Sequence, residues 1–447
     1  MAITAHFIDD DWNLQNRLVR FAYVPAPHTA EVLSDVLVNS LYDWNIDRKL
    51  STLTVDNCST NDAMIHLVLD KISPSNFVKR GEFFHMRCCA HIVNLIVKDG
   101  MNAIYGSIEK IRDSVSFWVA TPKREEKFEE TCRQLNINYR RKLALDCRTR
   151  WNSTYLMLTS ALPYREVFER LRHRESLYKV VPSDDEWEMA NELVDKLEVF
   201  YSVTELFSGT LYPTTNLYFP KVCEMRLNLN EWLLSPNEMI HRMATNMISK
   251  FEKYWDQINE VMAVGAILDP RYKMKLLKFF FPKIYGSQSE NHLSKVKKMM
   301  EELVCEYQLK ARVKRRATND DSSAFTLNVG HDEGSSKRKF NSIYLQFVED
   351  TSEDCVAKTE LDFYLEESVM VDKANLEKFD ILGYWKNIGV KYPTLQKIAR
   401  DFLAIPISTV ASEWGMETRG EHGERGEWGW GQLSPHGGEW GGDGDNI

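Results

Sequence analysis

The chain has 447 residues, of which 43% are hydrophobic and 11% aromatic, so most of it is expected to fold, in more than one domain. Its formal net charge of −9 excludes a polycation that coats nucleic acid over its whole surface, so any such contact must come from a local patch. The eight cysteines include no Cys-x-x-Cys pair, which argues against a disulfide framework and a structural zinc site and favours a reducing compartment. No apolar run approaches the roughly 18 residues that span a bilayer, so no membrane partner is expected.

Short apolar runs predict the first elements. Residues 2–8 and 14–23 predict a hairpin around an Asp-rich turn, followed by a helix over 32–44, a strand over 50–55, a helix over 61–72, a strand over 83–87 and a helix from about His91. This order predicts a mixed α/β sheet, and a chain that starts almost inside its first strand is expected to begin part-way through a domain. Asp56 ends the third strand, where such sheets commonly carry a metal-binding or catalytic group, although a strand-Asp-Asn turn is also an ordinary helix cap.

From about residue 152 to 310 the apolar spacing is helical. Ser183 and Glu186 form a capping box before one amphipathic stripe, and a second stripe runs from Met239 to Trp255; both predict packing inside a helical domain. A polar stretch follows over 311–359, with basic clusters at 312–316 and 337–339 that are either a nuclear import signal or ordinary linker charges. Helical patterning returns over 360–413, and the Gly/Trp/Glu-rich residues 414–447 are expected to be disordered.

Several motifs stand in a fixed order along the chain. They are Leu-Thr-Val-Asp-Asn-Cys-Ser-Thr-Asn-Asp at 53–62, Arg-Cys-Cys-Ala-His-Ile-Val-Asn-Leu at 87–95, Thr-Arg-Trp-Asn-Ser-Thr at 149–154, Leu-Asp-Pro-Arg at 268–271, and the segments 361–367, 384–386 and 399–413. Together they resemble the plant hAT-superfamily transposases, and within them the domesticated group called RICESLEEPER and DAYSLEEPER. The resemblance covers residues 2 to about 413, and the order and spacing of the motifs make it specific.

The resemblance implies an α/β plus α fold, in which the mixed sheet of an RNase H-like core is interrupted by a large all-helical insertion. The expected parts are a core over 1–151 lacking its first strand, an insertion over 152–310, a flexible linker over 311–359, a partial helical dimerisation region over 360–413, and a tail over 414–447 unlike the family. The family's BED zinc finger has no counterpart here. The implied location is the nucleus and the implied partners are DNA and a second copy, with no small-molecule substrate.

The family's chemistry uses three carboxylates that hold two Mg²⁺ ions for phosphoryl transfer. Asp56 matches the second carboxylate and Glu413 the third, whereas the first has no counterpart. Asp9, Asp10 and Asp11 fall in the hairpin turn and are not expected to replace it. The expectation is weak Mg²⁺ binding and a catalytically incomplete, DNA-binding chain. The alternatives are an active DDE-type transposase, if the sequence is a truncated gene model, and a domesticated regulator without catalysis.

Further residues carry expectations about nucleic acid. Arg150 and Trp151 match the family's pair that stabilises an unstacked base; the alternative is a buried tryptophan beside an ion pair. Cys88 and His91 match a Cys-x-x-His element, and two ligands alone make a poor zinc site, so a structural or DNA-positioning role is expected. The basic residues near this pair face only Asp146 as an acid, and they predict phosphate contacts or, alternatively, a solvated basic face: Arg133, Arg140, Arg141, Lys142, Arg148 and Arg150.

Overall fold

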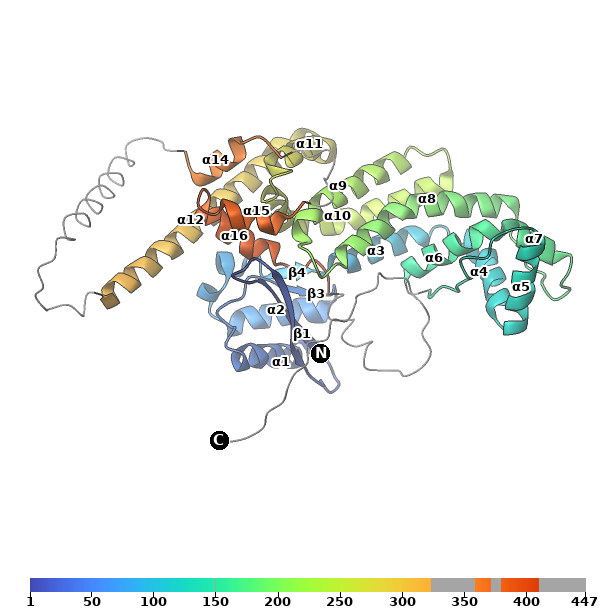
Figure 1. The fold of residues 1–447 in the computed structure, drawn as a ribbon, viewed down its shortest axis with the longest axis horizontal. Coiled ribbons are helices and arrows are strands. Elements are labelled where there is room, and N and C mark those ends of the chain that lie inside the picture. The colour runs from blue at the N-terminus through green and yellow to red at the C-terminus, as the bar shows by residue number, and fades with distance from the viewer. Residues whose placement is uncertain (149, 323–357, 371–378, 410–447) are drawn as a thin grey trace, which may run out of the picture.

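The computed structural model describes residues 1–148, 150–322, 358–370 and 379–409, which form a small α/β part beside a larger helical body (Figure 1). The expectations for 337–339, for Glu413 and for 414–447 lie outside the described residues. None of the described helices contains a stretch both long and apolar enough to cross a bilayer.

The α/β part follows the predicted order of elements. It contains β1 (Ala2–Ile8), β2 (Leu14–Phe21), α1 (Ala30–Asp43), β3 (Leu53–Val55), α2 (Ser59–Lys71), the short 3-10 turns η1 (Pro74–Asn76) and η2 (Val78–Gly81), and β4 (His85–Arg87). The predicted hairpin is confirmed, with Ile8 opposite Leu14 in an antiparallel register. β3 and β4 pair in parallel, with Leu53 opposite His85.

The strands differ from the expected single mixed sheet. Among the described residues, β1 pairs only with β2 and β3 only with β4, so there are two two-stranded sheets. Both nevertheless line one apolar cluster, in which Ile3 of β1 and Leu53 of β3 pack with Leu37 of α1 and Val68 of α2. Two-stranded sheets are marginal on their own in water. This cluster, and not a continuous ladder of backbone hydrogen bonds, therefore holds the two pairs together.

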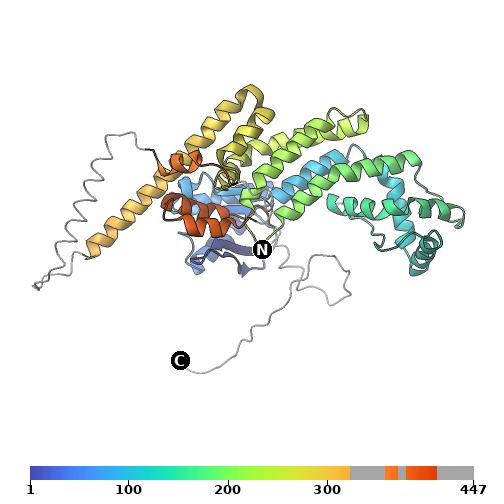
Figure 2. The ribbon, with the colours of Figure 1, turned by 45° about the horizontal axis from the view of Figure 1, so that its top comes forward.

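The helical body consists of long helices packed side by side (Figures 1 and 2). Its elements are α3 (Cys89–Met101), α4 (Tyr105–Val119), α5 (Pro122–Gln134), α6 (Trp151–Ala161), η3 (Leu162–Tyr164), α7 (Arg165–Arg172), α8 (Asp184–Phe207), α9 (Thr215–Trp232), α10 (Glu238–Ile267), α11 (Lys273–Tyr285), η4 (Gly286–Gln288) and α12 (Ser289–Ser322). The predicted capping box of α8 is confirmed: the Ser183 backbone N–H donates to Glu186 at 2.7 Å, and the Glu186 N–H donates to Ser183 Oγ at 3.4 Å.

Two boundaries differ from those expected. The helical body begins at Cys89, because the apolar face of α3, including Ile92 and Ile96, packs against α10; residue 151 therefore lies inside the body. At the other end α12 continues to Ser322, where a flexible linker was expected from residue 311. The sequence there lacks Gly and Pro and is rich in Lys, Arg and Ala, which favour a helix.

The C-terminal helices are α14 (Glu360–Glu366), α15 (Ile381–Ile388) and α16 (Pro393–Leu403). α14 and α15 contact the backbone where α10 ends, and α16 packs against α12 and β1. The Tyr364 hydroxyl donates to the Ile267 carbonyl at 3.0 Å, and Trp385 Nε1 donates to the Leu268 carbonyl at 2.9 Å. The buried Lys273 ammonium donates to the Tyr364 carbonyl at 2.7 Å. The Leu-Asp-Pro-Arg motif at 268–271 is therefore part of the joint that holds the C-terminal region on the helical body.

Residues 404–409, which we call the strap, connect the two parts of the molecule. The Thr54 hydroxyl of β3 donates to the Pro406 carbonyl at 2.7 Å, and the Cys89 N–H at the start of α3 donates to the Ile407 carbonyl at 2.8 Å. From the helical body, the Thr215 hydroxyl donates to the Ile405 carbonyl at 2.7 Å. The strap thus fixes the ends of β3 and α3 against α9.

We predict that Trp385→Ala destabilises the protein by about 3 to 5 kcal/mol in urea unfolding, because it leaves a cavity and orphans the Leu268 carbonyl. Val390→Ala is the control, since Val390 is 99% exposed, and it should change the free energy of unfolding by less than about 0.5 kcal/mol. Equal stabilities for the two variants would show that α15 does not dock on this joint.

Candidate functional site

Asp56 lies at the C-terminal end of β3, just before α2, as the sequence predicts. Its backbone carbonyl accepts a hydrogen bond from Asn61 Nδ2 at 3.0 Å, which fixes the turn between strand and helix. Its Oδ1 atom accepts a hydrogen bond from the hydroxyl of Thr409, the last residue of the strap, at 2.7 Å. Thr409 is separated from Asp56 by 353 positions, and sequence reasoning did not single it out.

Cys88 lies beside Asp56 and contacts the same residue of the strap. Its sulfur is 3.4 Å from the Thr409 backbone nitrogen and 3.3 Å from the Thr409 hydroxyl. Burial raises the pKa of the Cys88 thiol, and the hydrogen bonds from Thr409 only partly oppose this rise. A buried thiol that is hydrogen-bonded to the strap fits the structural role that the sequence predicts for Cys88.

The described residues do not fit the two-metal group that the family implies. No group of three or more His, Cys, Asp or Glu side chains among them is arranged to hold a metal ion. Glu413 lies outside the described part of the chain. Asp9 accepts hydrogen bonds from the backbone of Asp11 and Asn13 in the hairpin turn, and Asp10 pairs with Arg400 at 2.7 Å, so both are engaged there. His91 lies in the first turn of α3 and is partly exposed.

The second group of candidate residues lies in the basic loop, residues 135–150 between α5 and α6, of which residue 149 is not described. The described residues of this loop form no helix or strand. Five cationic side chains of the region are exposed and form no ion pair with another described residue: Arg133, Arg140, Arg141, Lys142 and Arg150. Arg148 is also exposed but pairs with Glu109 of α4 at 3.1 Å. Arg140, Arg141, Lys142 and Arg150 thus present exposed side chains from the basic loop, and Arg133 lies just before it at the end of α5.

Trp151 begins α6 and is buried, with 6% of its surface exposed. Its ring is therefore not available for stacking on a base in this structure, and of the alternative arrangement the burial of the tryptophan is observed. Arg150 is exposed next to it. The base-stacking role of the pair stays a prediction that would require the ring to move.

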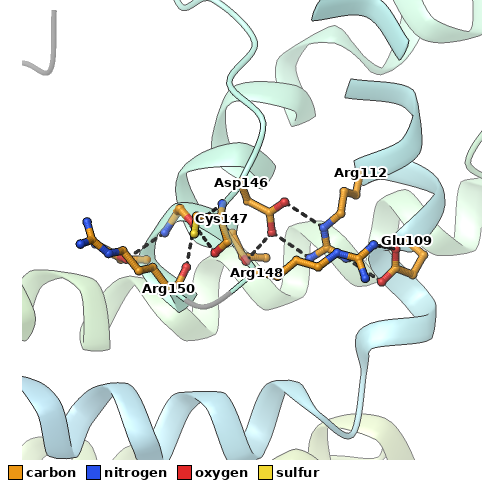
Figure 3. Close-up of polar contacts among 9 residues, drawn as sticks. Glu109, Arg112, Asp146, Cys147, Arg148 and Arg150 are labelled. Carbon is orange, nitrogen blue, oxygen red and sulfur yellow. Dashed lines mark hydrogen bonds and ion pairs between the residues drawn. The ribbon is translucent and has the colours of Figure 1, made fainter. Parts of the chain in front are cut away.

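A buried ion pair is formed by Arg112 of α4 and Asp146 of the basic loop (Figure 3). Two parallel hydrogen bonds of 2.8 Å join the guanidinium to the carboxylate, and the Thr154 hydroxyl adds a third at 2.6 Å. Burial alone would raise the pKa of Asp146, but the hydrogen bonds from Arg112 and Thr154 outweigh it and hold that pKa below its usual value. No motif of the sequence pointed to Arg112, which is 34 residues away from Asp146.

Comparison with known proteins shows that the chain is similar to plant hAT transposases over most of its length and that models of hAT transposase domains match it. Family models match as the ZBED1 RNase-like domain over 1–83, the ZBED1 RNase-like helical domain over 86–195, the hAT-like transposase RNase-H fold over 216–307 and the hAT family C-terminal dimerisation region over 360–425. The resemblance read from the motifs is therefore confirmed, as are an RNase-H-type fold, a helical part and a dimerisation region.

Individual relatives are plant proteins that the chain matches over most of its length. It is 37% identical to a Zea mays protein named "Putative AC transposase", over 94% of this chain and 51% of the relative. It is 35% identical to zinc finger BED domain-containing protein RICESLEEPER 1 of Oryza sativa subsp. japonica, over 92% and 58%. It is 30% identical to DAYSLEEPER of Arabidopsis thaliana, over 93% and 58%. The chain thus spans little more than half the length of these relatives.

We predict that iodoacetamide at pH 8 labels Cys88 at least about ten times more slowly than Cys58, because only the thiolate reacts. Cys58 is the internal control, since it is exposed and lies two residues after Asp56. Rates are measured by mass spectrometry of the native protein. Equal rates would contradict the arrangement in which the strap covers a buried thiol.

Proposed function

We propose that this chain is a hAT-transposase-derived DNA-binding protein of the nucleus, which contacts DNA phosphates through the basic loop. The basic loop presents exposed cationic side chains that form no ion pair with a described residue, and this supports the proposal. Asp146, the acidic residue of the loop, is buried and paired with Arg112. A molecule with net charge −9 repels DNA as a whole, so such a patch would direct how DNA approaches.

The proposed contact is with the phosphate backbone. Phosphate contacts set orientation and affinity but carry no direct sequence information. Arg140, Arg141 and Lys142 are consecutive, and long flexible cations at that spacing suit a run of phosphates. Base recognition, by contrast, would need a side chain that reaches a base edge or stacks on it, and the Trp151 ring is buried. Binding through the loop alone should therefore depend on salt and only weakly on sequence.

We further propose that the chain binds DNA without cutting it. Two observations support this. Among the described residues no group of three metal-ligand side chains forms around Asp56, and Asp56 Oδ1 accepts a hydrogen bond from the Thr409 hydroxyl. The alternative is an active DDE-type transposase that draws its other carboxylates from outside the described residues. A domesticated regulator without catalysis would need only the DNA binding proposed here.

Incubation with DNA carrying terminal inverted repeats distinguishes these alternatives. We expect no cleavage in Mg²⁺ or Mn²⁺. Cleavage that disappears in Asp56→Ala would establish a metal-dependent transposase instead, because that change removes a carboxylate without touching the basic loop.

We also propose a homodimer, on the basis of the match to the dimerisation region over 360–425. The large aromatic residues Tyr364 and Trp385 of this region are buried within the chain, so a partner would contact other side chains. Phe363 on α14, 53% exposed, and Val390 after α15, 99% exposed, remain on its surface. Sedimentation at micromolar concentration should show a dimer, and a monomer throughout would contradict the proposal.

We predict that the triple change Arg140→Glu, Arg141→Glu and Lys142→Glu weakens binding to a duplex by at least about tenfold at 100 mM salt. The slope of log Kd against log salt should fall by about two to three, since each phosphate contact contributes about 0.9. Fluorescence anisotropy measures both quantities.

The matched control is Lys275→Glu, Lys278→Glu and Lys283→Glu on α11, which makes the same change in net charge on exposed residues away from the α4–α7 group (Figure 1). An equal loss of affinity in the control would show that total charge, and not the basic loop, determines binding.

A further inference from the structure

The basic loop is irregular but fastened at several points. The Tyr164 hydroxyl donates to the Arg141 carbonyl at 2.8 Å, and the Leu143 N–H donates to the Tyr139 hydroxyl at 3.2 Å while the Leu143 side chain is buried. Near its end, the Ser153 hydroxyl donates to the Arg150 carbonyl at 2.6 Å. The backbone of two of the exposed cations, Arg141 and Arg150, is therefore held by side chains of the helical body.

The strongest of these attachments is the cluster of Arg112, Asp146 and Thr154. The side chains of Arg112 and Asp146 are 4% and 0% exposed, and their paired hydrogen bonds match the fork of the guanidinium to the two carboxylate oxygens. Two further residues belong to the cluster. The Thr154 hydroxyl of α6 donates a hydrogen bond to Asp146, and Glu109 Oε1 of α4 accepts a hydrogen bond from Arg112 Nη1 at 2.7 Å. Asp146 thus connects the loop with α4 and with α6.

This cluster also determines the charge of the loop. Asp146 is the one acidic residue between positions 135 and 150. Because Arg112 neutralises it below the surface, the exposed arginines and the lysine are not paired with it. Figure 3 shows the Asp146 carboxylate turned toward Arg112, while the Arg150 guanidinium extends from the opposite side of the loop. The buried pair therefore separates the loop's acid from its cations.

We propose that Arg112 is a positioning residue for DNA binding: through Asp146 and Thr154 it holds the basic loop in one shape, so that Arg140, Arg141, Lys142 and Arg150 meet DNA already arranged. This inference rests on the proposed function. A loop ordered before binding loses less conformational freedom when it binds, so affinity should depend on the buried cluster even though none of its members touches DNA.

The test is the double variant Arg112→Met with Asp146→Leu. It removes one positive and one negative charge, so net charge is unchanged, and apolar replacement of a buried ion pair commonly preserves the fold. The matched control is Lys127→Met with Glu175→Leu, which removes another ion pair of the helical body, at 2.8 Å, with the same charge balance. Fluorescence anisotropy on a duplex gives Kd against salt, and hydrogen exchange reports on the loop.

We expect the double variant to weaken DNA binding by about tenfold or more, with a shallower salt slope and faster exchange within 135–150. The control should stay within about twofold of the parent. Thr154→Val, which removes a single donor to Asp146 and is milder for folding, should shift Kd and loop exchange in the same direction by a smaller factor.

The inference would be overturned if the double variant bound DNA with an unchanged Kd although its loop exchanged faster. It would also be overturned if hydrogen exchange in the loop of the double variant did not change. These results differ from a failure of the proposed function itself. If the triple charge reversal at 140–142 leaves DNA binding intact, the loop is not the DNA contact and the proposed function fails. If that reversal abolishes binding but the Arg112/Asp146 double variant binds like the parent, only the positioning role of Arg112 is contradicted.

Discussion

The docking of the C-terminal segment on the rest of the chain is the constraint on which the structure depends. Trp385 and Tyr364 hydrogen-bond to the backbone that ends α10, and the strap then crosses to β3 and α3. Each of these hydrogen bonds joins residues far apart in sequence, so the C-terminal segment holds the helical body and the α/β part together. Without it, two short strand pairs would rest on one small apolar cluster.

This closure has different consequences for the two candidate sites. At the end of β3 it places Thr409 within hydrogen-bonding distance of Asp56 and Cys88. Among the described residues, no group of three or more His, Cys, Asp or Glu side chains that could hold a metal ion includes Asp56. The basic loop, by contrast, is held locally by α4, η3 and α6, through Arg112, Tyr164 and Thr154. These hydrogen bonds do not involve the strap, so the proposed DNA binding and any chemistry at Asp56 are separable.

Sequence reasoning succeeded where the signal is local. The capping box at Ser183, the apolar stripes of α8 and α10, the hairpin and the position of Asp56 at a strand end all depend on neighbours within a few residues. Strand pairing was not predictable in the same way, because an apolar run of three to eight residues indicates a strand but not its partner. The extension of α12 beyond residue 311 differs from the expected linker, because a polar, basic composition is typical of linkers and also favours an exposed helix.

The candidate sites show the same division. The sequence identified the cluster of cations at 133–150, and it left open whether Trp151 is exposed or buried, because only tertiary packing decides that. Arg112 and Thr409 carried no recognisable signal, since each acts through one contact with a distant residue. A cluster of charged residues can be predicted from a sequence, whereas the distant buried residues that position it cannot.

Hydrogen exchange of the full chain with and without a DNA duplex is the decisive measurement. We predict that the backbone amides of Leu143, Cys147 and Arg150, which donate hydrogen bonds, already exchange slowly in the free protein, and that DNA adds protection in the basic loop but not at the strap. Rapid exchange of these three amides in the free chain, or protection confined to another surface, would contradict the proposed role of the loop.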